Sequence, residues 1–210
     1  MDGFLRILEW IGVVSFAISG AMVAIRKHMD LFGVIFMGIL TAVGGGVIRD
    51  LMIGLTPPSC FRDPLYIRTA FLTSLLFFLP FLRRPMLRHQ VLFDRVMFLT
   101  DSLGLGLFVV GGVELALKTS PDFSPDLLLF IGMVSGTGGS VMRDVIAGDT
   151  PQIFVKHVYA VAALAGAAAY LALRQLPIHP YAALMLSAAL IFILRCLAAH
   201  YRWNLPRAEE

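Results

Sequence analysis

The chain has 210 residues, of which 58% are hydrophobic and 15% are charged, and its formal net charge is +3. Soluble domains carry about a quarter charged residues, so this composition excludes an ordinary soluble domain. The basic residues are spread between apolar blocks instead of forming one patch or tail, which argues against a nucleic-acid partner.

Seven apolar blocks follow one another along the chain, and crossing a bilayer takes about 20 helical residues. We therefore predict an all-α membrane protein that forms a single transmembrane domain over residues 1–210. The predicted spans are 5–25, 31–54, 65–82, 96–117, 127–148, 156–174 and 179–200.

The Lys and Arg residues near the connections predict the orientation, because basic residues favour the cytoplasmic side. The side that holds the N-terminus carries five, namely Arg6, Arg62, Arg68, Lys118 and Arg174. The opposite side carries ten, namely Arg26, Lys27, Arg83, Arg84, Arg88, Arg95, Lys156, Arg195, Arg202 and Arg207. The N-terminus is thus predicted outside and the C-terminus in the cytoplasm.

The second and fifth blocks share a sequence. Residues 44–57 read GGGVIRDLMIGLTP and residues 138–151 read GGSVMRDVIAGDTP, with eight identities at a constant offset of 94. The first and fourth blocks match more weakly at an offset of 92, which places Glu9 opposite Asp101. This weaker match also pairs Gly12, Phe16 and Gly20 with Gly104, Phe108 and Gly112.

The repeat contains three spans, and an odd number forces the second copy to enter the membrane from the opposite side. We predict two inverted three-helix repeats, at about 5–82 and about 96–174, plus a seventh helix at about 179–200. In such architectures the solute path lies between the halves near the middle of the bilayer.

Two glycine clusters lie inside apolar blocks, where each glycine costs about 1 kcal/mol of helix stability relative to alanine. They permit a kink or an unwound turn whose carbonyls can face a dehydrated monovalent cation. The alternative is that small residues let two helices pack closely. Because the clusters occupy equivalent repeat positions, we predict that they line the path. Their members are Gly44, Gly45, Gly46, Gly138, Gly139 and Ser140.

An Arg-Asp pair follows each cluster, and ionisable groups within a span are expected to face the protein interior or water. We predict that these pairs supply one charged position to each half of the path; alternatively, each Arg pairs with its Asp to stabilise the helix. Glu9 and Asp101 are candidate partners for the arginines, or else interfacial acids. The pairs are Arg49 with Asp50 and Arg143 with Asp144.

The paired GGGVIRD and GGSVMRD segments, on the second and fifth of seven spans, resemble the bacterial members of the trimeric intracellular cation (TRIC) channel family. The same domain is also labelled a glycine transporter domain in bacteria. The resemblance covers roughly residues 5–200. It implies a homotrimer in a bacterial inner or plasma membrane, with one pore in each protomer.

The resemblance also implies passage of monovalent cations, chiefly K⁺ with Na⁺ less favoured. The kinked second and fifth helices would line the pore, with Gly44, Gly45, Gly46, Gly138 and Gly139 as hinges. Ser140 replaces the third glycine of the second cluster, which implies a milder second break.

The sequence holds no Walker loop, HExxH, GxSxG or nucleotide fingerprint, and its histidines lack metal-ligand spacing. We therefore expect no enzyme, no metal site and no cofactor, only permeant K⁺ or Na⁺ and bound membrane lipid. The leading hypothesis is a potassium-preferring channel. The alternative is a secondary transporter of a small zwitterion such as glycine, in which an Arg holds the carboxylate and an Asp the ammonium group. A membrane scaffold without transport is the third.

Overall fold

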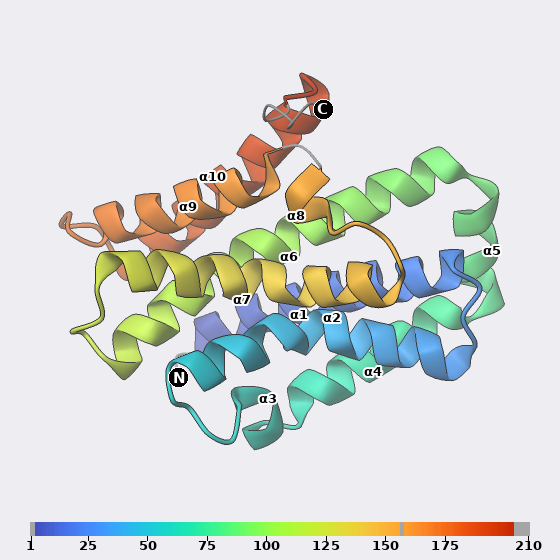
Figure 1. The fold of residues 1–210 in the computed structure, drawn as a ribbon, viewed down its shortest axis with the longest axis horizontal. Coiled ribbons are helices and arrows are strands. Elements are labelled where there is room, and N and C mark those ends of the chain that lie inside the picture. The colour runs from blue at the N-terminus through green and yellow to red at the C-terminus, as the bar shows by residue number, and fades with distance from the viewer. Residues whose placement is uncertain (1–2, 156–157, 204–210) are drawn as a thin grey trace, which may run out of the picture.

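The computed structural model describes residues 3–155 and 158–203, and helices make up nearly all of these ranges (Figure 1). The helices are α1 (Gly3–Arg26), α2 (Leu31–Met52), α3 (Ser59–Arg62), α4 (Leu65–Phe78), α5 (Pro80–Arg88), α6 (Gln90–Thr119), α7 (Pro125–Ile146), α8 (Gln152–Val155), α9 (Tyr159–Leu173) and α10 (Pro180–His200). The protein is all-α, as predicted.

Five of these helices, α1, α2, α6, α7 and α10, are long and apolar enough to cross a membrane. The α4–α5 pair passes the same test together but is bent by 65° at its junction, and α9 is a shorter apolar helix of 15 residues. The described residues thus give five crossings, or six with the bent pair. Seven complete crossings remain a prediction.

The third predicted span, 65–82, is not one straight helix. Helix α4 ends at Phe78 with Leu79 as its C-cap, and a new helix starts with Pro80 in its first position. Proline suits that position because its missing N–H group would have had no helical partner there. The predicted connection 83–90 is consequently mostly helical, and α6 begins at Gln90, earlier than predicted. Lys156, the predicted start of the sixth span, lies outside the described residues.

The two repeats end their central helices in the same way. An offset of 94 maps the bounds of α2 onto those of α7. Beyond each helix, Gly54 and Gly148 take φ values of 75° and 73°, and each donates its N–H to the carbonyl three residues earlier, on Leu51 and Val145. Glycine suits this left-handed position because it has no Cβ. The two repeats therefore share the same hydrogen bonds at the ends of their central helices.

Contacts between α2 and α7 establish that the repeats are inverted. A Cβ on Gly45 would lie 2.3 Å from the Ser135 carbonyl oxygen, and a Cβ on Gly139 would lie 2.1 Å from the Thr41 carbonyl oxygen. The offset of 94 maps Thr41 onto Ser135 and Gly45 onto Gly139, so each contact is the symmetry mate of the other. The two helices run antiparallel, and the pseudo-twofold axis passes between them at this crossing.

The α1–α6 contact obeys the same symmetry. The Phe108 ring fills the space beside Gly12, and the Phe16 ring fills the space beside Gly104. The two rings stack on each other with centroids 5.3 Å apart. The weaker match between the first and fourth blocks therefore reflects a second interface on the same axis.

The unwound turn predicted at the glycine clusters is absent, because α2 and α7 continue as uninterrupted α-helices through both. At Gly45 and Gly139 the missing side chains instead let the two backbones touch. This contact was the alternative interpretation of the clusters. The kink itself remains a prediction.

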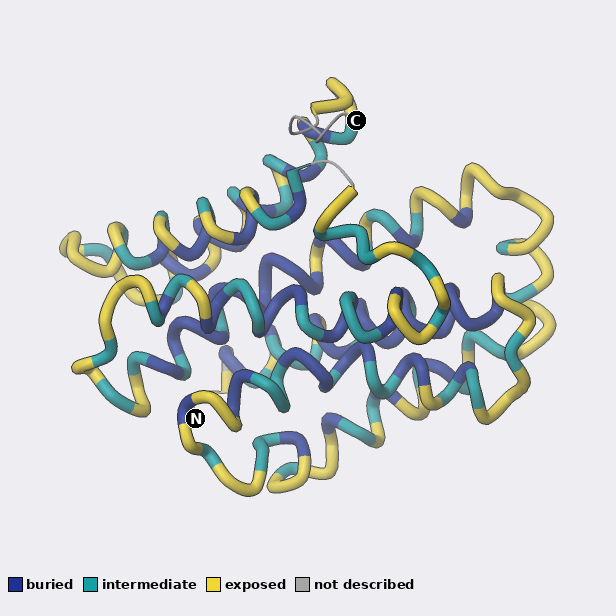
Figure 2. The backbone as a smooth tube through the Cα atoms, viewed as in Figure 1, coloured by how far each residue is buried: buried dark blue, intermediate teal, exposed yellow. Residues whose placement is uncertain are grey.

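The four long helices α1, α2, α6 and α7 form the centre, where buried residues concentrate (Figure 2). On one side α4 packs against α1 and α2; on the other, α9 packs against α6 and α7 at the equivalent position (Figure 1). Helix α10 packs against α6 and α9 and has no counterpart in the first repeat. The pseudo-symmetry is thus broken on one side only.

The α2–α7 crossing predicts that the protein's stability falls when a side chain is added at Gly45. Substitution Gly45→Ala should destabilise the protein by about 1–3 kcal/mol, since the new methyl group forces two backbones apart. Thermal unfolding in detergent measures this loss. The matched control is Gly111→Ala in α6, where no atom lies within 4 Å of the new Cβ. An equal effect of the two substitutions would contradict the assigned contact.

Candidate functional site

The first charged site lies at the end of α2, where Arg49 and Asp50 are both buried. The Arg49 Nε and Nη2 atoms lie 2.8 and 2.7 Å from Asp50 Oδ1. The other carboxylate oxygen of Asp50 accepts the N–H of Ser59, the first residue of α3, at 2.6 Å. Asp50 therefore neutralises Arg49 and also fixes the start of the next helix.

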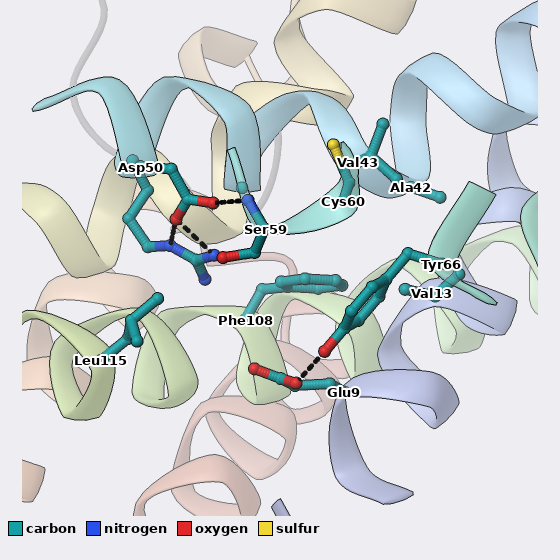
Figure 3. Close-up of a pocket in the computed structure, with 12 residues that line it drawn as sticks. Glu9, Val13, Ala42, Val43, Asp50, Ser59, Cys60, Tyr66, Phe108 and Leu115 are labelled. Atoms are coloured by element: carbon teal, nitrogen blue, oxygen red, sulfur yellow. Dashed lines mark hydrogen bonds and ion pairs between the residues drawn. The ribbon is translucent and has the colours of Figure 1, made fainter. Parts of the chain in front are cut away.

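A cavity of about 50 Å³ adjoins this pair. Glu9 of α1 reaches it from the opposite side and accepts a hydrogen bond from the hydroxyl of Tyr66 on α4 (Figure 3). Gly46 and Phe108 also line this cavity. The volume is enough for a few water molecules or a partly dehydrated monovalent cation.

Two further cavities adjoin this one, because neighbouring cavities share lining residues. A second cavity of about 30 Å³ shares Glu9 and Leu115 with the first. A third, of about 340 Å³, shares Glu114 and Lys118 with the second and reaches His179, in the turn between α9 and α10. Two acids, the half-buried Glu9 and the buried Glu114, therefore lie along one line of cavities.

Glu114 is held by three side chains near the outer end of this line. It accepts the Tyr170 hydroxyl at 2.6 Å and lies 3.1 Å from Lys118 Nζ and 4.0 Å from Arg174 Nε. Lys118 and Arg174 are partly exposed, so their charges are screened by solvent. Two long basic side chains, Lys118 and Arg174, therefore surround the buried Glu114 carboxylate in the cavity of about 340 Å³.

An ion pair fixes α1 beside the first site. Arg6 Nη2 lies 2.5 Å from an oxygen of Asp63, between α3 and α4. The backbone N–H of Leu65 and the Arg6 guanidinium together lower the pKa of the Asp63 carboxyl, so it stays charged at neutral pH. Glu9, one turn further along α1, is thereby kept next to α4.

The second charged site repeats this arrangement with more partners. Arg143 is fully buried, and its Nε lies 2.8 Å from Asp144 Oδ1. Asp144 Oδ2 accepts the N–H of Gln152, the first residue of α8, at 2.9 Å. Arg143 Nη1 also donates to Asp101 at 2.8 Å and to Ser19 at 2.5 Å. Asp101 thus partners the second arginine, as the sequence suggested.

Arg195 corrects the predicted list of interfacial charges. It was assigned to the cytoplasmic surface but is only 2% exposed, and it points from α10 into the second site. Its Nη2 lies 3.5 Å from Asp101 Oδ2, and its Nε donates to Ser102 at 2.9 Å. Asp101 on α6 attracts the long Arg195 side chain inward. Counting the basic residues near the ends of the spans cannot reveal this attraction.

The predicted glycines and charges fall into two groups. Both Arg-Asp pairs form, and Gly46 lines the first cavity, whereas Gly44, Gly45, Gly138 and Gly139 lie at the α2–α7 crossing. Ser140 hydrogen-bonds to the hydroxyl of Tyr159 at 3.1 Å and to the Thr137 carbonyl at 2.8 Å. Glu9 forms no ion pair with Arg49 among the described residues and bonds to Tyr66 instead.

Sequence reasoning missed the neutral partners of these charges, namely the hydrogen-bonding Ser19, Tyr66 and Ser102 and the Tyr159 ring beside Arg195. They come from helices other than those that carry the Arg-Asp pairs. One signal was available, since a carboxylate within a span, such as Glu9, needs a hydrogen-bond donor. Which residue supplies that donor depends on how the helices pack.

Comparison with known proteins agrees with this geometry. The sequence model of the Glycine transporter family matches the chain twice, at residues 6–81 and 98–175, once for each repeat. A UPF0126 membrane protein of Deinococcus radiodurans is 41% identical over 201 residues, covering 95% of this chain and 89% of the relative.

Two solved structures share the fold. The TRIC trimeric intracellular cation channel orthologue from Rhodobacter sphaeroides is 33% identical, with a TM-score of 0.87 over 96% of this chain and 100% of that chain. The chain belongs to the TRIC family. A structure that explains conductance through TRIC cation channels is 36% identical to this TRIC protein, with a TM-score of 0.83 over 98% and 97% of the two chains. The resemblance carried by the paired Arg-Asp segments is confirmed.

The buried pairs predict unequal stability effects for two neighbouring aspartates of this TRIC protein. Substitution Asp144→Asn should cost about 3–5 kcal/mol, because it removes a buried partner of Arg143. Substitution Asp149→Asn should cost less than about 1 kcal/mol, since Asp149 and Lys27 form a partly exposed pair at 2.6 Å. Unfolding in detergent measures both, and equal losses would contradict the assigned roles.

Proposed function

We propose that the protein is a monovalent-cation channel that prefers K⁺, with one conduction path inside each protomer of a homotrimer. Its solved relatives are described as trimeric cation channels, not as enzymes. The observation that carries the proposal is the line of cavities from Arg49 and Asp50 past Glu9 to Glu114. Bound K⁺ or Na⁺ and surrounding lipid are the expected ligands.

The charges of the first site support a cation rather than an anion. Arg49 is neutralised by Asp50, with both Nε and Nη2 directed at that carboxylate. Glu9 remains as an acid with a neutral donor, Tyr66, as its hydrogen-bonding partner. Two acids and one base therefore face the cavity, which attracts a cation, because low-dielectric walls focus the field.

Transport of glycine is the second candidate, favoured by the family model that carries this description. A glycine carboxylate would need a free guanidinium. Arg49 Nε and Nη2 are occupied by Asp50, and Nη1 lies 3.5 Å from Ser135 Oγ. Binding glycine would therefore break an existing buried pair, whereas a cation uses the unpaired charge of Glu9.

The membrane location follows from the helices. The protein is a multi-pass membrane protein, and membrane spans of bacterial outer membranes are β-barrels rather than helices. We therefore place it in a bacterial inner membrane. The N-terminus is proposed outside and the C-terminus in the cytoplasm. Without Arg195, which lies in the protein interior, the proposed cytoplasmic side still has nine basic residues and the outer side has five.

The reversal potential in planar bilayers tests the channel. With KCl on one side and NaCl on the other, the reversal potential should make the KCl side negative, because K⁺ leaves that side faster than Na⁺ enters it. Substitution Glu9→Gln should lower cation conductance by about tenfold or more, since it removes the unpaired charge yet keeps a partner for Tyr66. The control Asp122→Asn lies on an exposed turn and should leave conductance unchanged.

Two results would reject this function. One is the absence of discrete openings, combined with saturable, gradient-coupled glycine uptake by the purified protein in liposomes. The other is equal conductance of the Glu9→Gln variant and the native protein, which would place the path elsewhere.

A further inference from the structure

The two charged sites have the same origin but different charge. The first site, formed by Glu9, Arg49 and Asp50, has two acids and one base. The second site, formed by Asp101, Arg143, Asp144 and Arg195, has two acids and two bases. Without Arg195, the second site would carry the same net charge as the first.

Arg195 comes from the one long helix that the repeat does not duplicate. Helix α10 packs on α6 and α9, and the first repeat has no helix at the equivalent place. The first site consequently receives no second arginine in the described part of the chain, and a cavity of about 50 Å³ lies there. The additional charge is thus a property of α10 and not of the repeat.

The Arg195 guanidinium balances charge in the second site without using all of its hydrogen-bond donors. Its Nη2 lies 3.5 Å from Asp101 Oδ2, longer than a strong charged hydrogen bond. Its Nη1 is buried without a hydrogen-bond partner among the described residues. Its central carbon lies 4.0 Å from the centroid of the Tyr159 ring, a cation–π distance.

We propose that Arg195 is a tethered cation that occupies the second site in place of a free monovalent cation. Removing its charge then creates a buried K⁺ site between Asp101, Arg143, Asp144 and the Tyr159 ring. This inference rests on the proposed cation channel, because it assigns binding of a free cation to the first site and occupation by an internal charge to the second. The two equivalent sites therefore differ in how they hold cations.

Substitution Arg195→Met tests the proposal through protein stability. It removes the charge and keeps an unbranched apolar stem. The purified variant should unfold about 4 °C or more higher in KCl than in N-methyl-D-glucamine chloride of equal ionic strength, because K⁺ binds only the folded state and the organic cation is too large to enter. The native protein should show a smaller difference between the two salts, because K⁺ can bind it only at the first site.

Three control variants separate the charge from other effects. Arg195→Lys keeps a tethered cation and should show the same difference between the salts as the native protein. Arg88→Gln removes an exposed positive charge and should behave like the native protein. The double variant Arg195→Met with Asp101→Asn restores the charge balance of the second site, so its difference between the salts should return to that of the native protein.

A variant Arg195→Met that gains no more stability from KCl than the native protein does, or that is unfolded in both salts, would overturn the proposal, because a free cation would then fail to replace the guanidinium. The salt comparison requires no conduction. If the native protein conducts cations while Arg195→Met ignores K⁺, the inference fails alone. If no variant conducts but K⁺ stabilises Arg195→Met, the channel function fails and the cation site stands.

Discussion

The structure depends on one contact, the antiparallel crossing of α2 and α7 at Gly45 and Gly139. A side chain on either glycine would enter the backbone of the other helix, at 2.3 or 2.1 Å from a carbonyl oxygen. Glycine is unfavourable in a helix interior, but here it permits an approach that no other residue allows. Because the contact lies on the pseudo-twofold axis, it fixes both repeats at once.

The placement of charge follows from that crossing. Each Arg-Asp pair comes a few residues after its glycine cluster, so inversion carries the two pairs to opposite ends of the same helix pair. Each Asp also holds the first N–H of the short helix that follows, on Ser59 or Gln152. The buried charges therefore shape the backbone as well as the local field. The repeats supply two equivalent sites, and α10 makes them unequal.

Patterns that lie within the chain were readable from the sequence. Block length predicted the membrane helices, and the offset of 94 predicted the inverted repeat, whose central helices end on the same hydrogen bonds. The break at Leu79 was missed because hydropathy continues across it, although Pro80 signalled a new helix start. The unwinding expected at Gly44–Gly46 did not occur, because the gain from backbone contact with α7 depends on a neighbour that composition does not reveal.

Contacts between distant segments were harder to predict. The Asp101–Arg143 pair was suggested because the repeat placed an acid on the adjacent helix. The position of Arg195 was not, since ninety-odd residues separate it from Asp101 and its place near the end of a span is typical of an interfacial charge. Tyr66 and Ser19 carry no sequence signal of their own. Their roles depend on which helix faces pack together.

The central claim is that a cation path runs inside the protomer past Glu9. Anomalous diffraction from crystals soaked in a Tl⁺ salt tests it most directly, because Tl⁺ substitutes for K⁺ and scatters strongly. A Tl⁺ peak in the cavity between Glu9 and Asp50, lost in the Glu9→Gln variant, is the predicted result. Peaks confined to the surface or to contacts between subunits, with that cavity empty, would contradict the account.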